Sequence, residues 1–493
     1  MITREVPLDL VGGSSFDRYR KQSIESTFNM IISDNALVPF AGYQTVKEIA
    51  KAGTARELYV SSSYNHMIVV IGSAIYEISR QLSIARIGEL KTARGDVYIA
   101  ENNAGQIALV DGLAIYVYDY RTSTFTTVTK DAEGKDLPFQ PVYISFLNGY
   151  FIIPDGKSNL YHLSDLNDGT QWRVGDENPD TTGALTTRPD VLKAVVIHPD
   201  IPRILVMGTS VTEIWSPFAN ESPTPIFPFA RDNSLNINYG ALNRATIATG
   251  FGMIVWVSTN EAAGPAIHAF SRSGIKAIST DGIDFVLGAL TKPEDSSAFL
   301  FEEDGHVFYQ ITFPTDKVSF VYDFTTEKFF NVTDECLNAH IAKRVAFFNN
   351  KHYFVSNIDA NLYEMGTNFT TLNGHVCPRV RITKPVRAPD SRRFVTTNVG
   401  LTIEQGNNAL VQTGGMKHAA TLQNTSQRVG LSVSKDGSDT FGNNDFIDLN
   451  SLGNRRNKLQ WWQLGMANDL TMQFEFFSAA RFVVTSGWVR IRQ

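Results

Sequence analysis

Four potential metal ligands lie in the second half of the sequence. Cys336 and His340 are four residues apart and would share one face of a helix, while His375 and Cys377 would share one face of a strand. Two thiolates and two imidazoles could bind zinc tetrahedrally. Their spacing matches no compact zinc module, however, and each residue also has an ordinary structural role. We therefore predict no metal and no other cofactor, and leave open whether the four side chains meet.

One carboxylate, Glu213, interrupts the apolar stretch ILVMGTSVTEIWSPF at residues 204–218. Such a residue is either a buried acid with structural partners or a general acid whose pKa is raised. Glycoside hydrolysis would need a second carboxylate at a defined distance, and the sequence does not identify one. We interpret Glu213 as structural.

The sequence contains none of the motifs G-x-S-x-G, H-E-x-x-H, G-x-G-x-x-G or the Walker loop. The segment SKDGSDTF at 434–441 resembles the aspartate box of sialidases and related propellers. There, Asp436 would accept backbone N–H bonds, Gly437 would take the turn and Phe441 would pack beneath. Such boxes stabilise hairpins and are not catalytic, so we predict no catalytic residues and no enzyme.

The stretch 204–218 also reads as two strands around a turn at Gly208, where a positive φ would cost little. Six other stretches share its strand–turn–strand layout, and the third strand of each unit carries an aromatic residue. These aromatic residues, spaced 40 to 55 residues apart, are Tyr76, Tyr116, Tyr161, Trp215, Phe270, Tyr322 and Tyr363. The period suits propeller blades of about 40–50 residues. We predict an all-β fold with a six- or seven-bladed β-propeller, in which Trp215 is buried between blades; a large β-sandwich is the alternative.

The bulk composition limits the class of protein. The 493 residues carry a net charge of −6, which argues against a simple nucleic-acid binder. Two cysteines are too few for a disulfide scaffold and fit a reducing compartment. The N-terminus lacks an apolar core of signal-peptide length, and the longest apolar runs are strand-sized. We expect synthesis in the cytoplasm, without a cleaved signal or a membrane-spanning segment.

Composition along the chain suggests three parts. We expect an N-terminal arm at 1–38, the propeller at 39–370, with LVPFAGYQTV (37–46) leading into its first blade, and a C-terminal all-β, sandwich-like domain at 371–493. Three tracts are predicted to be long loops: 164–190 and 216–242, which we expect to contact partners, and the polar segment 401–427.

A basic strip occupies residues 376–394, with six Lys and Arg against one Asp, so the strip carries +5 and the remaining chain −11. Arg379, Arg381 and Arg387 alternate with Val380, Ile382 and Val386, which indicates a strand with one basic and one apolar face. Such a face could bind the phosphates of DNA or the carboxylates of a protein. We expect these arginines to dock an acidic surface of a partner or of a neighbouring subunit, because a charged patch supplies orientation and a faster association rate.

Several segments resemble, in order, the packaged-DNA stabilisation proteins of short-tailed bacteriophages, which form the tail hub or nozzle. They are LVGGSSFDRYRKQSIESTFNM in the arm, FLNGYFIIPDGKSNLYHLSDLNDGTQW at 146–172, GTSVTEIW with Pro228-Phe229, Gly240 and Ser279-Thr280, and RVGLSVSKDGSDTF with LQWWQLG near the end. The arm lacks a cysteine often seen there, the aspartate box ends in Phe441 rather than Trp, and the basic strip has no match.

This resemblance implies a structural protein of the virion tail that forms a homo-oligomeric ring of six subunits below the portal and its adaptor protein. The ring would retain packaged DNA, carry fibres or spikes and a plug or needle protein, and let double-stranded DNA pass transiently. An acidic wall suits such a channel because it repels phosphates.

Two other functions remain open from the sequence: a carbohydrate-binding or glycan-cleaving propeller, and a cytoplasmic propeller scaffold. Acids and arginines clustered in a central pocket would favour the enzyme. An axial ring of acids facing a wide pore would favour the tail hub. The host, the blade count, the channel-facing surface and the attached proteins are not determined.

Overall fold

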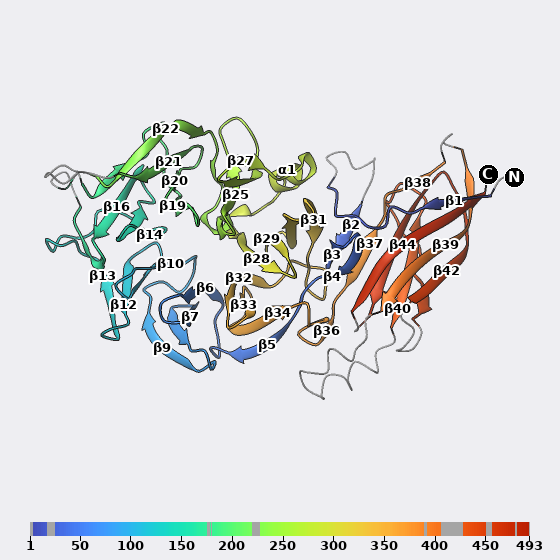
Figure 1. Ribbon diagram of the computed structural model, residues 1–493, viewed down its shortest axis with the longest axis horizontal. Coiled ribbons are helices and arrows are strands. Elements are labelled where there is room, and N and C mark those ends of the chain that lie inside the picture. Colours follow the sequence, from blue (N-terminus) through green and yellow to red (C-terminus); the bar gives the residue numbers. More distant parts are fainter. Residues whose placement is uncertain are drawn as a thin grey trace.

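The computed structural model describes residues 3–16, 25–174, 178, 180–218, 227–388, 392–405, 427–449, 456–478 and 481–492. A ring of small antiparallel sheets occupies one end of the molecule, and a two-layered β domain occupies the other (Figure 1). This is the β-propeller and C-terminal sandwich predicted from the repeats.

Seven sheets follow one another around the ring. The first contains β6 (Ala55–Ser61), β7 (His66–Ile71), β8 (Ala74–Ile78) and β9 (Ile84–Glu89); the second contains β10 (Tyr98–Glu101), β11 (Gln106–Val110), β12 (Ile115–Asp119) and β13 (Thr124–Val128). The third contains β14 (Ser145–Leu147), β15 (Tyr150–Pro154), β16 (Leu160–Asp165), β17 (Asp168–Trp172) and β18 (Thr182–Ala184); the fourth contains β19 (Ala194–Ile197), β20 (Ile204–Met207), β21 (Thr212–Pro217) and β22 (Phe229–Ile237).

The fifth sheet contains β23 (Gly240–Ala241), β24 (Ala248–Gly250), β25 (Met253–Thr259), β26 (Ala266–Ser271) and β27 (Gly274–Ala277); the sixth contains β28 (Ser297–Glu303), β29 (His306–Phe313), β30 (Val318–Asp323) and β31 (Lys328–Asn331). The seventh contains β32 (Ala342–Phe348), β33 (Lys351–Ser356), β34 (Asn361–Gly366), β5 (Gly42–Glu48), β35 (Thr371–Leu372) and β36 (His375–Val376). Helix α1 (Asp281–Gly288) and the short helices η1 (Arg244–Thr246) and η2 (Pro293–Asp295) lie in connections.

Hydrophobic packing closes the ring. Strands such as β11 and β20 are buried along their whole length, because sheets on both sides cover them. The cluster between the seventh sheet and the first includes Phe348 and Leu362 from one and Met67 and Val69 from the other. All seven aromatic residues of the predicted period lie on the third strand of their sheets. The repeat was therefore placed correctly in the sequence.

The N-terminal segment closes the propeller rather than opening it. Strand β5 pairs antiparallel with β34, so residues expected to lead into the first blade form the fourth strand of the seventh sheet. This pairing joins segments that lie more than 300 residues apart, and it locks the two ends of the ring together. One unit is thus built from both ends of the repeat region.

The sandwich takes strands from both ends of the chain. One layer contains β3 (Met30–Ser33), β4 (Ala36–Pro39), β44 (Phe482–Arg492), β39 (Phe394–Gln405), β42 (Arg456–Ala467) and β1 (Thr3–Pro7). The other layer contains β37 (Arg379–Ile382), β43 (Asp469–Phe477), β40 (Arg428–Ser434), β41 (Asp445–Asp448) and β38 (Val386–Arg387). Strands β1, β3 and β4, which precede residue 40, pair within this C-terminal domain. The division of the chain at residues 38 and 370 therefore stays a proposal.

Strand β2 (Ser26–Phe28) makes the two domains continuous. It pairs in parallel with β31 of the sixth propeller sheet and antiparallel with β37 of the sandwich. One hydrogen-bonded sheet therefore runs from the propeller into the sandwich.

Three local predictions are wrong. Residues 216–242 are not one long loop, because they contain the nine-residue strand β22; residues 219–226 of that tract lie outside the described part, as do most of 401–427. Residues 164–190 likewise contain β17 and β18. Gly208 does not take a positive φ. It is needed for space, because a Cβ there would lie 2.3 Å from Oδ2 of Asp190, which accepts a bond from the Ser210 N–H.

Candidate functional site

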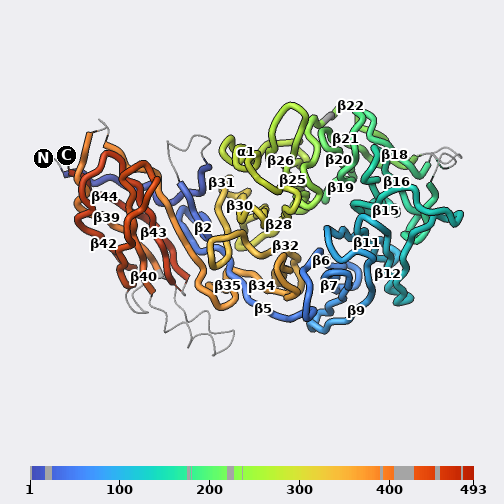
Figure 2. Tube along the Cα trace, turned by 180° about the vertical axis from the view of Figure 1, so that it is seen from behind, coloured from blue at the N-terminus to red at the C-terminus, as the bar shows by residue number. Residues whose placement is uncertain are grey.

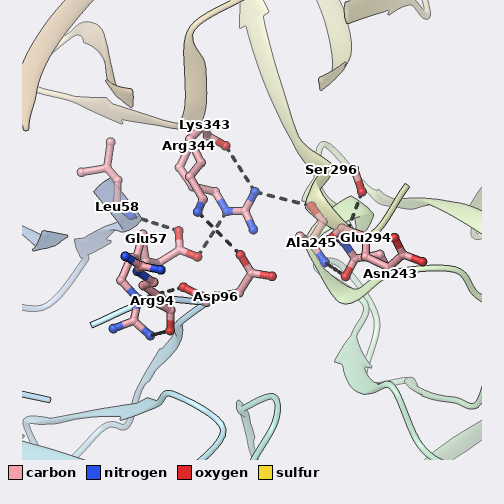
Figure 3. A network of polar contacts seen from close by, with 12 residues as sticks. Glu57, Leu58, Arg94, Asp96, Asn243, Ala245, Glu294, Ser296, Lys343 and Arg344 are labelled. Atoms are coloured by element: carbon pink, nitrogen blue, oxygen red, sulfur yellow. Dashed lines mark hydrogen bonds and ion pairs between the residues drawn. The ribbon is translucent and has the colours of Figure 1, made fainter. Parts of the chain in front are cut away.

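Charged side chains meet at the centre of the propeller, where the first strands of several sheets converge (Figure 3). Nε of Arg344, on β32, lies 3.2 Å from Oε2 of Glu57, on β6. Nη1 of Arg344 donates to the carbonyl of Ala245 in η1 (3.4 Å) and to the carbonyl of Ala298 in β28 of the sixth sheet (3.3 Å). Arg344 therefore joins three sheets and η1 at the axis.

The ion pair at this centre is enclosed by the protein. Glu57 and Arg344 are both buried. Burial raises the pKa of Glu57, and the neighbouring guanidinium opposes that shift. Nζ of Lys343 lies 3.6 Å from Oδ1 of Asp96 at its edge. Acids and arginines thus cluster on the axis, but they neutralise one another and do not line an open pocket.

Two cavities lie away from the axis. One, of about 400 Å³, is lined by β18, β21 and β22 with the aromatic side chains of Trp215, Phe218, Phe227 and Phe229. The other, of about 420 Å³, is lined by residues including Ile201, Arg203 and Arg272. Neither cavity is lined by a carboxylate, so neither offers the acid pair that a glycosidase requires.

Glu213 is held as a structural acid. Its Oε1 accepts bonds from the backbone N–H groups of Thr186 (2.9 Å) and Thr187 (2.7 Å), and from both of their hydroxyls. Its Oε2 accepts from Nε1 of Trp215 at 3.0 Å. Although burial alone would raise its pKa, these bonds leave the pKa of Glu213 lowered. The alternative of a general acid with a raised pKa is therefore wrong.

Trp215 departs from its prediction. It is only half-buried, where it packs edge-to-face against Tyr161 and Phe227 at the rim of the aromatic-lined cavity. Trp215 packs against the hydrophobic cluster between the third and fourth sheets, and the neighbouring Ile214 points into the core between the fourth and fifth sheets. The pattern therefore placed Trp215 between blades correctly but overestimated its burial.

The four candidate metal ligands do not come together. Cys336 is exposed in a turn and His375 is exposed on β36. His340 is buried against the Tyr43 ring, and burial lowers its pKa to about 4. Cys377 is buried in the cluster that contains Tyr43, and burial raises its pKa. Within the described residues, no three His, Cys, Asp or Glu side chains are placed to share a metal ion.

The aspartate-box segment forms the turn between β40 and β41. Oδ1 of Asp436 accepts bonds from the backbone N–H groups of Asp439 and Thr440, both at 3.1 Å, and Gly437 has φ +79°. Hydrogen bonds lower the pKa of Asp436, with the Ser434 hydroxyl as the largest contributor. These contacts are the hairpin-stabilising ones expected from the sequence.

The basic strip binds its own chain. Arg381 is buried, and its guanidinium donates to the carbonyls of Leu10 (2.7 Å), Gly13 (3.0 Å) and Asp9 (3.1 Å) and pairs with Glu25. Arg379 is also buried and donates to the carbonyls of Ser478 and Thr370. Docking of these two arginines onto a partner is therefore wrong. Their strand, β37, pairs with β2 on one side and β43 on the other, so neither of its edges is free for a partner.

Sequence reasoning missed the Glu57–Arg344 pair. A signal was present, because both residues begin the first strand of a repeat unit, in ELYV and KRVAFF. Opposite charges at equivalent positions of two units indicate a contact only once closure of the ring brings those strands together.

Comparisons with known proteins identify the family. Residues 22–370 match the family model described as Bacteriophage P22 Gp10, beta-propeller, and residues 380–492 match the one described as Bacteriophage P22 Gp10, beta-sandwich. No curated protein was found to match the sequence. No helix in the described part of the chain is long and apolar enough to cross a membrane.

Solved structures share the fold only distantly. The extracellular domain of a one-component system from B. thetaiotaomicron has a TM-score of 0.42 and 10% identity over 65% of this chain; this chain covers 39% of its length. Streptogramin B lyase has a TM-score of 0.41 and 11% identity over 66% of this chain and 97% of its own.

The chain belongs to the P22 Gp10 family, the tail hub or nozzle proteins of short-tailed phages, because the two models together cover nearly its whole length. It is a structural component of the phage tail, and so of the virion.

Proposed function

We propose that copies of this chain assemble into a ring of six subunits that extends the DNA channel below the portal and its adaptor protein. The ring retains packaged DNA, anchors fibres or spikes, and is closed by a plug or needle protein until ejection. We assign the chain no catalytic, cofactor-binding or metal-binding residue, and we propose that it is made in the host cytoplasm.

The closed propeller axis is the observation that carries this proposal. Arg344 reaches across the centre to Glu57, to η1 and to β28 of the sixth sheet, so buried charged side chains and their hydrogen bonds lie at the propeller axis. A DNA duplex therefore has no path through a single propeller. A channel must be formed between several copies, which requires a ring.

Net charge supports the same arrangement. Residues 1–375, which include the propeller, contain 29 Lys and Arg against 42 Asp and Glu, a net charge of −13. A channel wall of this sign repels phosphates and lets DNA slide instead of binding it.

The test combines assembly with DNA retention. We expect the purified chain to elute as a ring-sized species in size-exclusion chromatography with light scattering, and negative-stain images to show a central opening. Virions assembled without the chain should package DNA and then lose it to added nuclease, and the purified chain should restore protection. A chain that stays monomeric at all concentrations, or virions that keep their DNA without it, would contradict the proposal.

A further inference from the structure

An apolar patch lies on the exposed face of the outer sandwich layer. Trp462 and Met466 on β42 are 60% and 55% exposed, and Val395 on β39, which pairs with Met466, is 36% exposed. Trp, Met and Arg are enriched at protein interfaces, and exposed apolar residues that lie together, unlike single ones, mark interaction sites. These three residues, together with the neighbouring Trp488, are called the outer patch below.

The neighbouring strand β44 holds Trp488 in a fixed position on the same face. Trp488 lies across Gly400 of β39, so closely that a Cβ at Gly400 would fall 2.2 Å from Cε2 of the indole. The Arg490 guanidinium stacks on the indole, 4.8 Å from the ring centroid, and pairs with Glu5 on β1 at 3.0 Å. A preorganised aromatic–arginine pair loses little conformational entropy when a partner covers it.

The outer layer lies at the end of the long axis of the molecule. Figure 2 shows β39, β42 and β44 at that end, with β43 and β40 between them and the propeller. Among the described strands, none pairs with the second edge of the twelve-residue strand β42. The patch therefore faces away from the other described strands of its own chain.

Charge indicates what covers the patch. Residues 376–493 contain 15 Lys and Arg against 8 Asp and Glu, a net charge of +7, whereas residues 1–375 carry −13. Lys458 is exposed on β42, four residues before Trp462 on the same strand. Two sandwiches meeting around a two-fold axis would bring like charges together, whereas a sandwich meeting an acidic propeller is favoured.

We propose that the outer patch of one copy docks on the acidic propeller of the next copy, in a head-to-tail contact that closes the ring. This inference rests on the proposed ring and adds the surface that forms it. A head-to-tail contact uses two different surfaces on each copy, so it generates a ring when the rotation between copies closes and an open filament when it does not. The indole of Trp462 supplies the apolar centre of the contact, and the basic residues around it form the polar rim.

The first experiment removes the centre of the patch. A Trp462→Ala, Met466→Ala double variant should need about tenfold or more higher protein concentration to assemble, as measured by light scattering, because truncating an aromatic interface residue typically costs that much affinity. Its melting temperature as a monomer should stay near that of the wild type. Phe446→Ala, which removes a 40%-exposed aromatic residue from the opposite sandwich layer, is the control and should assemble normally.

A photo-crosslinking amino acid at Lys458 tests the orientation. With isotopically mixed copies, adducts between chains should map to propeller residues between 42 and 372 of the neighbouring copy. Adducts that map to the sandwich of the neighbouring copy, whose strands include β1, β3 and β4, would overturn the head-to-tail arrangement. DNA binding that the double variant loses while it still assembles would show instead that the patch contacts nucleic acid.

The outcomes separate this inference from the proposed ring. If the wild type and the double variant assemble equally well, the docking surface is wrong and the ring stands. If the wild type never assembles, both the proposed ring and the proposed docking surface are wrong.

Discussion

Nε of Arg344 lies 3.2 Å from Oε2 of Glu57, and this contact joins the last sheet of the propeller to the first. The two residues are 287 positions apart in the sequence. Their contact complements the pairing of β34 with β5 at the outer edge, so the ring is closed both at its axis and at its rim. The charged side chains at the axis of each subunit therefore serve to hold the propeller closed.

Arg344→Met should destabilise the propeller by about 3–5 kcal/mol, because it leaves the Glu57 carboxylate buried without its cation. Urea unfolding followed by circular dichroism measures the change. The control is Glu327→Gln, which breaks the exposed pair with Lys276 and should cost less than about 1 kcal/mol. Adding Glu57→Leu to Arg344→Met should recover part of the loss. Equal unfolding midpoints for Arg344→Met and Glu327→Gln would show that the axial pair does not hold the ring.

Local patterns in the sequence were sufficient to predict the repeat. The third-strand aromatic residues mark a position that recurs in every sheet, and five of the seven, all except Tyr76 and Trp215, are buried there. Turn residues within a hairpin, such as Gly437 beside Asp436, were also readable, because the contacts involved lie only a few residues apart. The family resemblance rested on the same short strand-and-turn segments.

Contacts between distant segments could not be predicted in the same way. The alternation around Arg379 and Arg381 indicated an exposed basic face, yet β2 and β43 flank the strand, and Arg381 is wrapped by backbone carbonyls of the arm. The residues near these arginines in the sequence do not indicate that other segments of the chain bury them. The same holds for β5, whose partner strand β34 lies more than 300 residues away.

Stability should fall as the pH drops from about 6.5 to about 4. Burial lowers the pKa of His162 and of His340 from the ordinary value of 6.5 to about 4. In this window the unfolded chain binds protons that the folded chain does not, so protonation favours unfolding; above pH 6.5 both states are neutral and the effect vanishes. Each histidine contributes up to about 3 kcal/mol.

Urea unfolding between pH 4 and pH 7 measures this dependence. His340→Gln should flatten the loss of stability in that window, whereas His375→Gln should not, because His375 is exposed. If His340→Gln leaves the pH profile unchanged, the imidazole titrates normally in the folded state.

Trp256→Ala should destabilise the propeller by about 3–5 kcal/mol, because this side chain is fully buried between the fourth and fifth sheets and its Nε1 donates to the carbonyl of Gly240 at 3.1 Å. Trp215→Ala should cost less, since part of that side chain is already exposed in the folded chain. Thermal unfolding of the two variants side by side checks the order. A Trp215→Ala loss as large as that of Trp256→Ala would mean that Trp215 is buried in solution, as the sequence pattern first indicated.

Gly282→Ala should detach part of the N-terminal arm from the propeller. A Cβ at Gly282, in α1, would lie only 1.2 Å from the carbonyl oxygen of Phe16, a backbone atom that cannot rotate aside. The Phe16 ring packs edge-to-face on Phe320 of the sixth sheet at 4.9 Å, so displacing the backbone also disturbs this contact. We expect a loss of about 1–3 kcal/mol, with faster hydrogen exchange in residues 8–16.

Gly288→Ala, at the end of the same helix, is the matched control. The nearest atom to its Cβ would be 4.0 Å away, and alanine favours the helix by up to about 1 kcal/mol. A Gly282→Ala chain that is as stable as the Gly288→Ala chain, with unchanged exchange in the arm, would show that the arm does not pack on α1.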